Sequence, residues 1–391
     1  MIRNIVFWIH LCVGSVASLV ILMMSITGVL LSYEHQIRTW SLSQQYEIYP
    51  GNENRGRLPL EDIFSVTNTY LIEHNINRKV AGVIISADET DPYAISLGKG
   101  NYLFVNPFTA TILGDHKQGP HNFFDLVWRW HRWFNLSGDS VATGRAVTGA
   151  ANLGFLFLIL SGLYLWLPKI IKWRTLRAVL FFNTNAMKVS RARDYNWHHV
   201  FGIWSAVPLI IIIATATLFH YTWASDLLGW AAGKPDKSVS VSESESESES
   251  QQKKPIITSF SKQKSLDELF LRAQQQLPLW NRIQISLPTD VGAPVSFIID
   301  QGNSRQPQKR HELVLHAASG EVTSWTPFSS KPRASRWRSY TRYLHTGEVY
   351  GWFGQTIAAI VSMTSAIMVW TGLALAYRRL IRPLLQAKPE S

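Results

Sequence analysis

Four stretches of this 391-residue chain lack Asp, Glu, Lys and Arg over lengths that suit a membrane span. A transmembrane helix needs about 20 consecutive apolar residues, because the hydrocarbon core of a bilayer is about 30 Å thick. The four stretches are residues 5–31, 146–167, 197–225 and 349–377. The first is too long for a signal peptide and has no cleavage motif, so we read it as a retained helix. We therefore predict an integral membrane α-helical core of four transmembrane helices.

Lys and Arg predict the orientation of these helices, because cytoplasmic loops are enriched in both residues. The connection between the second and third stretches is basic, and so is the C-terminal tail. These basic residues are Lys169, Lys172, Arg174, Arg177, Lys188, Arg191 and Arg193 in the connection, and Arg378, Arg379, Arg382 and Lys388 in the tail. Both regions are expected in the cytoplasm. Residues 32–145 and 226–348 are then expected on the other side, which in a bacterial inner membrane is the periplasm.

Both large polar segments read as a helix followed by strands, which predicts two α+β domains. In the first, "LPLEDIFSVTNTYLIEHN" precedes the strand-like runs "KVAGVIIS", "DPYAISL" and "NYLFVNPFTATILGD". In the second, "SLDELFLRAQQQL" precedes "NRIQISLP", "APVSFIID" and "HELVLHAASGEVTSW". Residues 234–255 form a polar Ser-Glu linker of low complexity, which cannot bury a core and is expected to be a solvated tether.

The chain reads as one unit used twice, an internal two-fold repeat. The first and third spans both open with His-x-x-x-Gly, as His10/Gly14 and His198/Gly202. "WRWHRWF" precedes the second span, which ends "SGLYLW"; "TRYLHTGEVYG" precedes the fourth, which ends "TGLALAY". The register favours His198 over the adjacent His199 as the counterpart of His10.

The repeat places two histidine pairs, one at each membrane face. His10 and His198 lie at the cytoplasmic ends of their spans, and His131 and His345 precede the other two spans on the periplasmic side. Two imidazoles from facing helices are suitable axial ligands for haem iron. We therefore predict two haem b groups, with these four histidines as metal ligands. The competing interpretation is that they are ordinary interfacial histidines.

Haem also requires apolar walls and cations for its propionates. The candidate walls are Phe7, Trp8, Trp133, Trp197, Phe201, Tyr343 and Trp352. The candidate cations beside the periplasmic pair are Arg129, Arg132, Arg338 and Arg342.

His35 and His220 form a rival pair, at the periplasmic ends of the first and third spans. They compete because His131 precedes Ala146 by 15 residues. A straight helix would carry His131 about 20 Å beyond the apolar core. Either that haem lies near the membrane surface, or the chain bends at Gly138.

Other classes of site are excluded by composition. The single cysteine, Cys12, excludes an intrachain disulfide and Cys-rich metal sites, and the Cys-x-x-Cys-His motif of covalent haem attachment is absent. The sequence has no Gly-x-Gly-x-x-Gly after a strand, so we expect no dinucleotide module. The net charge of +11 would suit nucleic acid in a soluble protein, but here we expect the partners to be membrane lipid and not nucleic acid.

These motifs together resemble the PepSY-associated transmembrane proteins, a family that includes FoxB-type ferric-siderophore reductases. The resemblance covers nearly the whole chain and rests most on "LHTGEVYGWFG" with "TGLALAY", and also on "HRWF" and "TGVLLSYEH". It identifies the two polar segments as PepSY-like domains. Their final hairpin usually carries Asp-Pro-x-Thr-Gly; residues 106–110 here read Asn-Pro-Phe-Thr-Ala, and "HAASGEV" is a looser second copy.

The resemblance implies a haem-dependent oxidoreductase of the inner membrane that reduces ferric siderophores in the periplasm. It carries over His10, His131, His198 and His345 as haem ligands, and no catalytic residue is assigned. The electron would come from a quinol or another cytoplasmic donor. Two alternatives remain: a non-enzymatic accessory or sensory protein whose PepSY-like domains bind a partner, and a siderophore permease.

The predicted organisation follows the chain in seven parts. They are transmembrane helix 1 in 1–34, a PepSY-like domain in 35–127, an outer helix with transmembrane helix 2 in 128–168, a cytoplasmic loop in 169–196, transmembrane helix 3 in 197–225, the linker and second PepSY-like domain in 226–335, and an outer helix, transmembrane helix 4 and the tail in 336–391.

Overall fold

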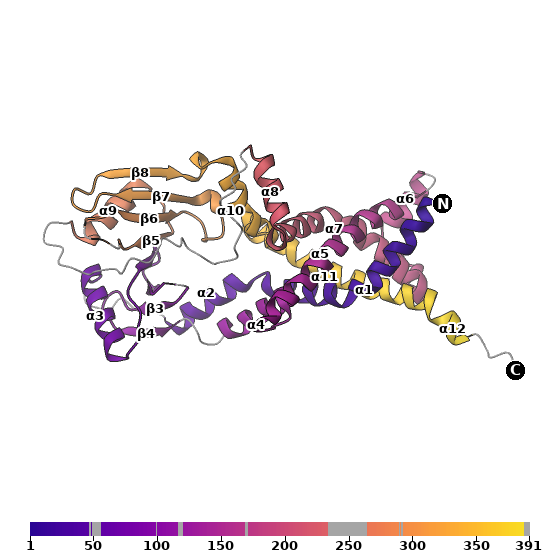
Figure 1. Cartoon of the computed structure of the whole chain (residues 1–391), viewed down its shortest axis with the longest axis horizontal. Coiled ribbons are helices and arrows are strands. Elements are labelled where there is room, and N and C mark those ends of the chain that lie inside the picture. The colour runs from indigo at the N-terminus through magenta and orange to yellow at the C-terminus, as the bar shows by residue number, and fades with distance from the viewer. Residues whose placement is uncertain are drawn as a thin grey trace. The chain divides into compact units, whose positions relative to one another are not determined.

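The computed structural model of the chain describes residues 1–46, 48, 56–98, 100–115, 120–168, 171–233, 264–288, 290 and 292–386 (Figure 1). The chain divides into two compact units. The helical unit contains Met1–Glu34, Phe123–Val241 and Thr341–Ser391, and the sheet unit contains His35–Asn122 and Ser242–Tyr340. The predicted tether at 234–255 lies outside the described residues.

Four helices of the helical unit are long and apolar enough to cross a membrane, as the four apolar stretches predict. They are α1 (Ile2–Leu31), α5 (Ser140–Trp166), α7 (Ser190–His220) and α11 (Gly351–Leu380). Both α1 and α7 pack against both α5 and α11, so the four form a bundle (Figure 1). The remaining helices that lie wholly in this unit are α6 (Trp173–Leu180), η1 (Ala186–Lys188), α8 (Thr222–Ala231), η4 (Glu348–Tyr350) and α12 (Arg382–Gln386). The unit boundaries fall within α4 (Pro120–Trp133) and α10 (Arg333–His345).

The bundle is apolar outside and partly polar inside, the reverse of a soluble protein. Val16 of α1 and Val207 of α7 are 85% and 69% exposed, as suits contact with lipid. Inside, the Ser25 and Ser365 hydroxyls of α1 and α11 are 2.8 Å apart, within hydrogen-bond distance. Lipid tails are as apolar as a protein core, so helices in a membrane are held together by close packing and by such polar pairs.

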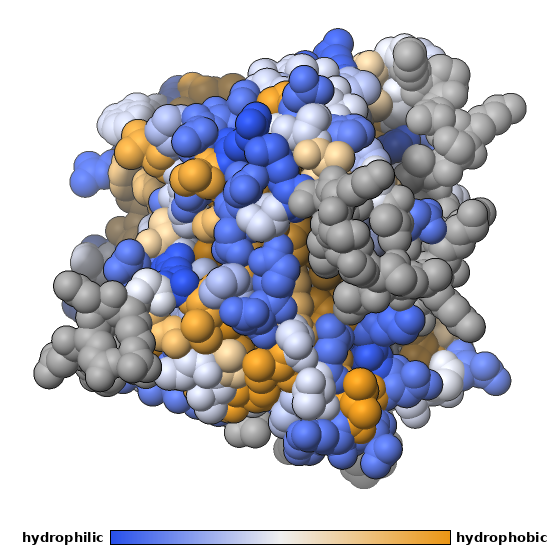
Figure 2. Space-filling view, turned by 90° about the vertical axis from the view of Figure 1, so that its left-hand side faces the viewer, coloured by the Kyte–Doolittle hydropathy of each residue, from blue (hydrophilic) through white to orange (hydrophobic). Residues whose placement is uncertain are grey.

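The sheet unit is built on one antiparallel sheet of eight strands, in the order β4-β3-β2-β1-β5-β6-β7-β8. The strands are β1 (Gly82–Ser86), β2 (Tyr93–Ser96), β3 (Tyr102–Val105), β4 (Ile112–Asp115), β5 (Arg282–Ser286), β6 (Val295–Asp300), β7 (Arg310–Leu315) and β8 (Val322–Pro327). The helices are α2 (Glu34–Gln45), α3 (Leu60–Glu73), α9 (Leu266–Gln276), η2 (Pro307–Lys309) and η3 (Phe328–Ser330), with α2 beginning in the helical unit. Hydrophilic and hydrophobic side chains are mixed on the face that Figure 2 presents.

The two polar segments therefore share one sheet, whereas the sequence predicts two separate domains. They join at the β1–β5 pair, where Val83 lies opposite Ile285 and Ile85 opposite Ile283. Gly82 permits this pairing, because a Cβ there would collide with the Ile285 carbonyl oxygen. The four isoleucine and valine side chains are fully buried, so the joint lies in the middle of the hydrophobic core.

Helices α3 and α9 supply the rest of that core and bind each other through their first turns. The Glu61 carboxylate of α3 accepts the Leu266 N–H at 2.7 Å, and the Asp267 carboxylate of α9 accepts the Leu60 N–H at 2.9 Å. Each carboxylate thus caps the amino end of the other helix, where unpaired N–H groups favour negative charge.

The two final hairpins show what the PepSY-like motif requires of the backbone. Ala110 closes the β3–β4 hairpin with φ 56°, and Gly320 closes the β7–β8 hairpin with φ 68°. The Asn106 carboxamide oxygen accepts the Phe108 N–H at 2.8 Å and so keeps the turn that Asp would make. Ala110 takes the left-handed conformation despite its Cβ, at a cost of about 1–2 kcal/mol.

The reciprocal caps predict a pH-dependent stability of the sheet unit. Burial, together with the neighbouring Glu61 carboxyl, raises the pKa of Asp267 to about 6, from 3.8 in an unfolded chain. A raised pKa in the folded state means that the contribution to stability is complete below pH 3.8 and is lost as the pH rises through 6.

We therefore expect the full-length protein in detergent to lose thermal stability between pH 4.5 and pH 6.5, and Asp267→Asn to lose less. Scanning fluorimetry of the two proteins measures the difference, which reports the titration of Asp267 together with its partner Glu61. Parallel pH profiles would show that Asp267 does not titrate in this window.

Candidate haem-binding site

His10 and His198 line one cavity of about 1430 Å³ inside the helical unit. Pockets that bind drug-sized ligands have about 300–1,000 Å³, so this cavity has room for a larger cofactor. Each of the four long helices lines it with one glycine, and these are Gly14, Gly162, Gly202 and Gly372. The walls between them are mostly aliphatic, including Leu158, Ile203 and Met368.

Each of these two histidines is held by the helix that faces it. The His10 Nδ1 is 2.8 Å from the Ser161 Oγ of α5, and the His198 Nδ1 is 3.1 Å from the Thr371 Oγ1 of α11. The next residue in both cases is glycine. A Cβ at Gly162 would lie 3.4 Å from His10 Cε1, and one at Gly372 would lie 3.3 Å from His198 Cε1. In each pair, the hydroxyl therefore holds the Nδ1 atom of the imidazole, and the glycine leaves space beside the ring at Cε1.

His131 and His345 also lie together, with ring centroids 6.4 Å apart. The His131 Nδ1 is 2.8 Å from the Thr27 Oγ1 of α1. The His345 Nδ1 donates to the Ile212 carbonyl of α7 at 2.9 Å and is 3.3 Å from the Thr215 Oγ1. The second pair is thus anchored to the same two helices that carry the first pair.

Chain reversals bring the second pair into the bundle. Phe134, Asn135 and Gly138, between α4 and α5, all have φ between 55° and 59°. The chain turns back here, so that the Thr148 hydroxyl of α5 donates to the Arg132 carbonyl of α4 at 2.7 Å. Of the two arrangements that the sequence leaves open for His131, the structure has the bend.

The reversal before α11 depends on glycine more strictly. Gly347 and Gly351 have φ of 78° and 61°. Gly347 and Gly354 approach so closely that a Cβ on either would collide with the backbone of the other. This turn places His345 beside α7, and it accounts for three glycines of the "LHTGEVYGWFG" motif.

The partners of each Nδ1 indicate the tautomer of the histidine. The Met368 and Ile212 carbonyls can only accept, so His198 and His345 carry their proton on Nδ1. The Ser161 and Thr27 hydroxyls beside His10 and His131 lie 2.7 Å from the Phe157 and Met23 carbonyls of their own helices, to which they can donate. We assign His10 and His131 the same tautomer, with these hydroxyls as acceptors, which leaves each Nε2 lone pair for a metal.

The geometry of the second pair fits one metal between its two rings. A metal–imidazole bond is about 2.1 Å. The ring nitrogen is about 1.1 Å from the ring centre, given C–N bonds near 1.33 Å. Two rings on opposite sides of one metal would then have centres about 6.4 Å apart, so the observed separation leaves room for a metal between them. No group of three or more His, Cys, Asp or Glu residues that could hold a metal is found in the described part of the chain. Two imidazoles are also the axial ligands that b-type haem uses.

The comparisons with known proteins agree with this architecture. The model of the PepSY-associated TM region matches residues 7–379. The chain belongs to this family. No curated protein matches its sequence. The family match covers nearly all of the four long helices and both histidine pairs, which lie between residues 10 and 345.

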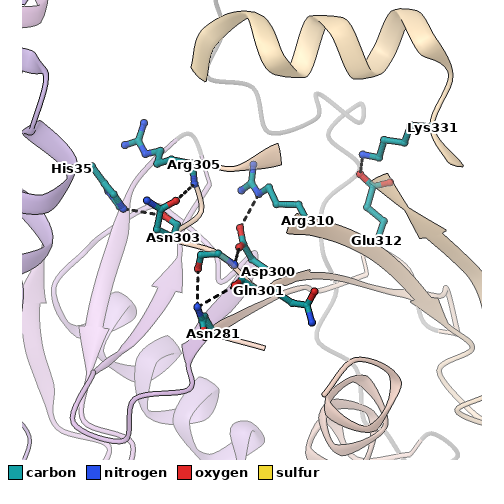
Figure 3. Close-up of polar contacts among 10 residues, drawn as sticks. His35, Asn281, Asp300, Gln301, Asn303, Arg305, Arg310, Glu312 and Lys331 are labelled. Atoms are coloured by element: carbon teal, nitrogen blue, oxygen red, sulfur yellow. Dashed lines mark hydrogen bonds and ion pairs between the residues drawn. The ribbon is translucent and has the colours of Figure 1, made fainter. Parts of the chain in front are cut away.

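His35 and His220, the rival pair of this PepSY-associated chain, belong to different units. His35 lies in the sheet unit, where its Nε2 is 3.0 Å from the Asn303 carbonyl oxygen (Figure 3). His220 ends α7 in the helical unit. His199 also lines the cavity, but its Nδ1 donates to the Tyr195 carbonyl of its own helix at 2.9 Å. Only His198 of the adjacent pair is anchored across the bundle, as the repeat register favours.

The predicted walls and cations fit less well. Phe7 lines the cavity, whereas Trp8, Trp197 and Phe201 are not among its lining residues. Arg132 stacks over Trp128, with its guanidinium carbon 4.5 Å from the ring centroid. Arg338 belongs to the sheet unit, and Arg129, Arg132 and Arg342 belong to the helical unit.

Sequence reasoning missed the four anchoring residues, Ser161, Thr371, Thr27 and Thr215. A signal was available, because Thr27 follows His10 by 17 residues and Thr215 follows His198 by the same 17. The Ser-Gly and Thr-Gly pairs also occupy matching places in "SGLYLW" and "TGLALAY".

The anchors predict unequal effects on haem binding. Among the described residues, His10 has the Ser161 hydroxyl as its single hydrogen-bond partner, whereas His198 also contacts the Met368 carbonyl at 3.1 Å and so keeps a partner without Thr371. Loss of such a supporting partner lowers metal affinity about 10–100-fold. We therefore expect Ser161→Ala to weaken haem binding by about tenfold or more, and Thr371→Val by much less. Soret titrations of the two purified variants make the comparison, and equal losses would contradict the anchoring role.

Proposed function

We propose that this protein is a dihaem b-type electron carrier of the bacterial inner membrane that reduces ferric iron in siderophore complexes in the periplasm. The observation that carries the proposal is the pair of matching histidine sites, each with Nδ1 anchored and Nε2 free. The His131–His345 ring separation of 6.4 Å supports it, because it leaves room for one metal between the two imidazoles.

The bundle suits electron transfer across a membrane. His10 and Thr27 are 17 residues apart on α1, as are His198 and Thr215 on α7, which corresponds to a rise of about 25 Å. The two proposed sites are therefore near opposite ends of the same helices. Between them, Ile159, Leu209, Ile213 and Val361 form a buried apolar cluster that excludes water.

Bound haem iron would alternate between ferric and ferrous states and so carry one electron at a time. The proposed reaction transfers one electron to each ferric chelate, which is thereby reduced to a ferrous chelate. A quinol donor would supply two electrons and release two protons for every two chelates reduced. Reduction favours iron release, because hard oxygen ligands hold ferric iron much more strongly than the softer ferrous ion.

The orientation in the membrane rests on the basic residues of the proposed cytoplasmic side. Helix α6 carries Arg174 and Arg177, and the end of α11 carries Arg378 and Arg379. The Lys and Arg bias of cytoplasmic loops supports a periplasmic location for the sheet unit in this proposal. The sheet unit is accordingly the region proposed to receive the ferric siderophore.

Haem stoichiometry tests the two sites. We expect protein purified from haem-supplemented cells to bind two haems per chain, with a Soret band and a sharp alpha band after dithionite addition. His198→Ala and His345→Ala should each retain one haem, because each removes one ligand of one pair.

His199→Ala is the matched control and should retain two haems. Colourless protein would contradict the proposed function and favour the accessory or sensory alternative. Loss of haem in His35→Ala and His220→Ala, with retention in His131→Ala and His345→Ala, would show that the rival pair binds the metal.

Substrate class is tested separately by reoxidation. The dithionite-reduced protein, freed of excess reductant under anaerobic conditions, should be reoxidised by ferric siderophores, with the alpha band as the measurement. The matching iron-free siderophores should cause no reoxidation. Reoxidation rates unaffected by any ferric siderophore would contradict the substrate assignment and leave the haem assignment intact.

A further inference from the structure

The cavity of the first histidine pair has an uneven distribution of charge. Its described lining residues include four arginines and no aspartate or glutamate. Arg3 lies at the start of α1, Arg191 at the start of α7, and Arg378 and Arg379 at the end of α11. The lining farther along α1 is uncharged, with Ser18 and Ile21. All of the positive charge therefore lies at the end of the cavity nearest the start of α1.

Two of the four arginines are committed to structural contacts. The Arg3 guanidinium donates to the Leu165 and Leu167 carbonyls at 2.7 and 2.9 Å, and so satisfies the last turn of α5. The Arg378 Nη1 is 2.7 Å from the Asp194 carboxylate, which is 1% exposed. Asp194 is not among the residues that line the cavity, so the charge of Arg378 is neutralised by a carboxylate outside the cavity.

Arg191 and Arg379 remain available to a ligand. Within the described residues, neither guanidinium group makes a hydrogen bond or an ion pair with another residue. The central guanidinium carbon of Arg379 lies 5.0 and 5.5 Å from the ring centroids of Phe7 and Trp8, within the range of cation–π contacts. Such contacts do not use the N–H donors of the guanidinium.

We propose that Arg191 and Arg379 form an anion site for the two propionate carboxylates of the haem held by His10 and His198. The inference rests on the proposed function and adds an orientation to it: the carboxylate edge of this haem faces the start of α1. The opposite orientation would place two carboxylates among Ser18, Ile21 and Leu209, where no cation compensates for their lost hydration. Guanidinium groups match carboxylates with paired, charge-assisted hydrogen bonds.

The test compares haem b with its dimethyl ester, in which both carboxylates are blocked. The background is full-length His345→Ala, which retains only the first histidine pair. It is purified without haem, and each compound is titrated in while the Soret band is followed. We expect the ester to bind at least about tenfold more weakly than haem b, because it loses the charged hydrogen bonds.

Arg191→Gln with Arg379→Gln, added to this background, should remove the difference between haem and ester by weakening haem alone. Arg382→Gln is the matched control, since Arg382 follows one turn later and does not line the cavity. If the double variant fails to fold, Arg191→Lys with Arg379→Lys keeps the charges and should preserve part of the difference.

The outcomes separate this inference from the proposed function. Equal affinities for haem and ester in the background protein would overturn the anion site while leaving haem binding established. A difference that persists in a folded double glutamine variant would overturn the assignment to these two arginines. Absence of any haem binding in the background protein would overturn the proposed function, and this inference with it.

Discussion

The hydrogen bond from each histidine Nδ1 to a hydroxyl or carbonyl on a facing helix is the interaction on which the site depends. Inside a membrane no water is available, so a buried polar group without a partner costs about 1–3 kcal/mol or more. The hydroxyls of Ser161, Thr27, Thr371 and Thr215 provide such partners. In the assigned tautomers, each hydroxyl donates to a carbonyl of its own helix and accepts from the imidazole Nδ1–H, so one small side chain gives the histidine its hydrogen-bond partner.

These bonds also explain why the chain reverses direction where it does. His131 and His345 belong to α4 and α10, which are not among the membrane-spanning helices, and reach α1 and α7 only after tight turns. Phe134 and Asn135 occupy the left-handed region without being glycine, at a cost of about 1–2 kcal/mol each. The Thr148 bond to the Arg132 carbonyl and the anchored imidazole offset that strain. Strain placed next to a proposed ligand is the usual pattern at functional sites.

The sequence predicts those parts of the structure that depend on local pattern. Four uncharged stretches are enough to locate α1, α5, α7 and α11, because a bilayer demands length and apolarity and little else. The spacing of His10 and His198 from their glycines likewise selects His198 over His199, and only His198 is anchored across the bundle.

The features that escape prediction depend on residues far apart in the chain. Ser161 and Thr371 look like ordinary small residues for helix packing, and their role appears only when α1 and α7 are placed against them. Gly82 looks like a weak point in a strand, yet it lets β1 pair with β5, although Gly82 and its partner Ser286 are far apart in the sequence. The positive φ of Phe134 has no residue-type signal at all. The local sequence pattern therefore locates the helices and strands. The joining of the two polar segments into one sheet and the orientation of the histidine rings depend on contacts between residues that are far apart in the sequence.

The two proposed sites are coupled mechanically through α1 and α7. Each of these helices carries a histidine of the first pair and, 17 residues later, the hydroxyl that anchors a histidine of the second. A shift of either helix along its axis would move a ligand at one site and an anchor at the other. The buried cluster of Ile159, Leu209, Ile213 and Val361 opposes such a shift, because close-packed side chains do not deform continuously. The separation between the sites is thus set by helices held in register, which is what a fixed path for electrons requires.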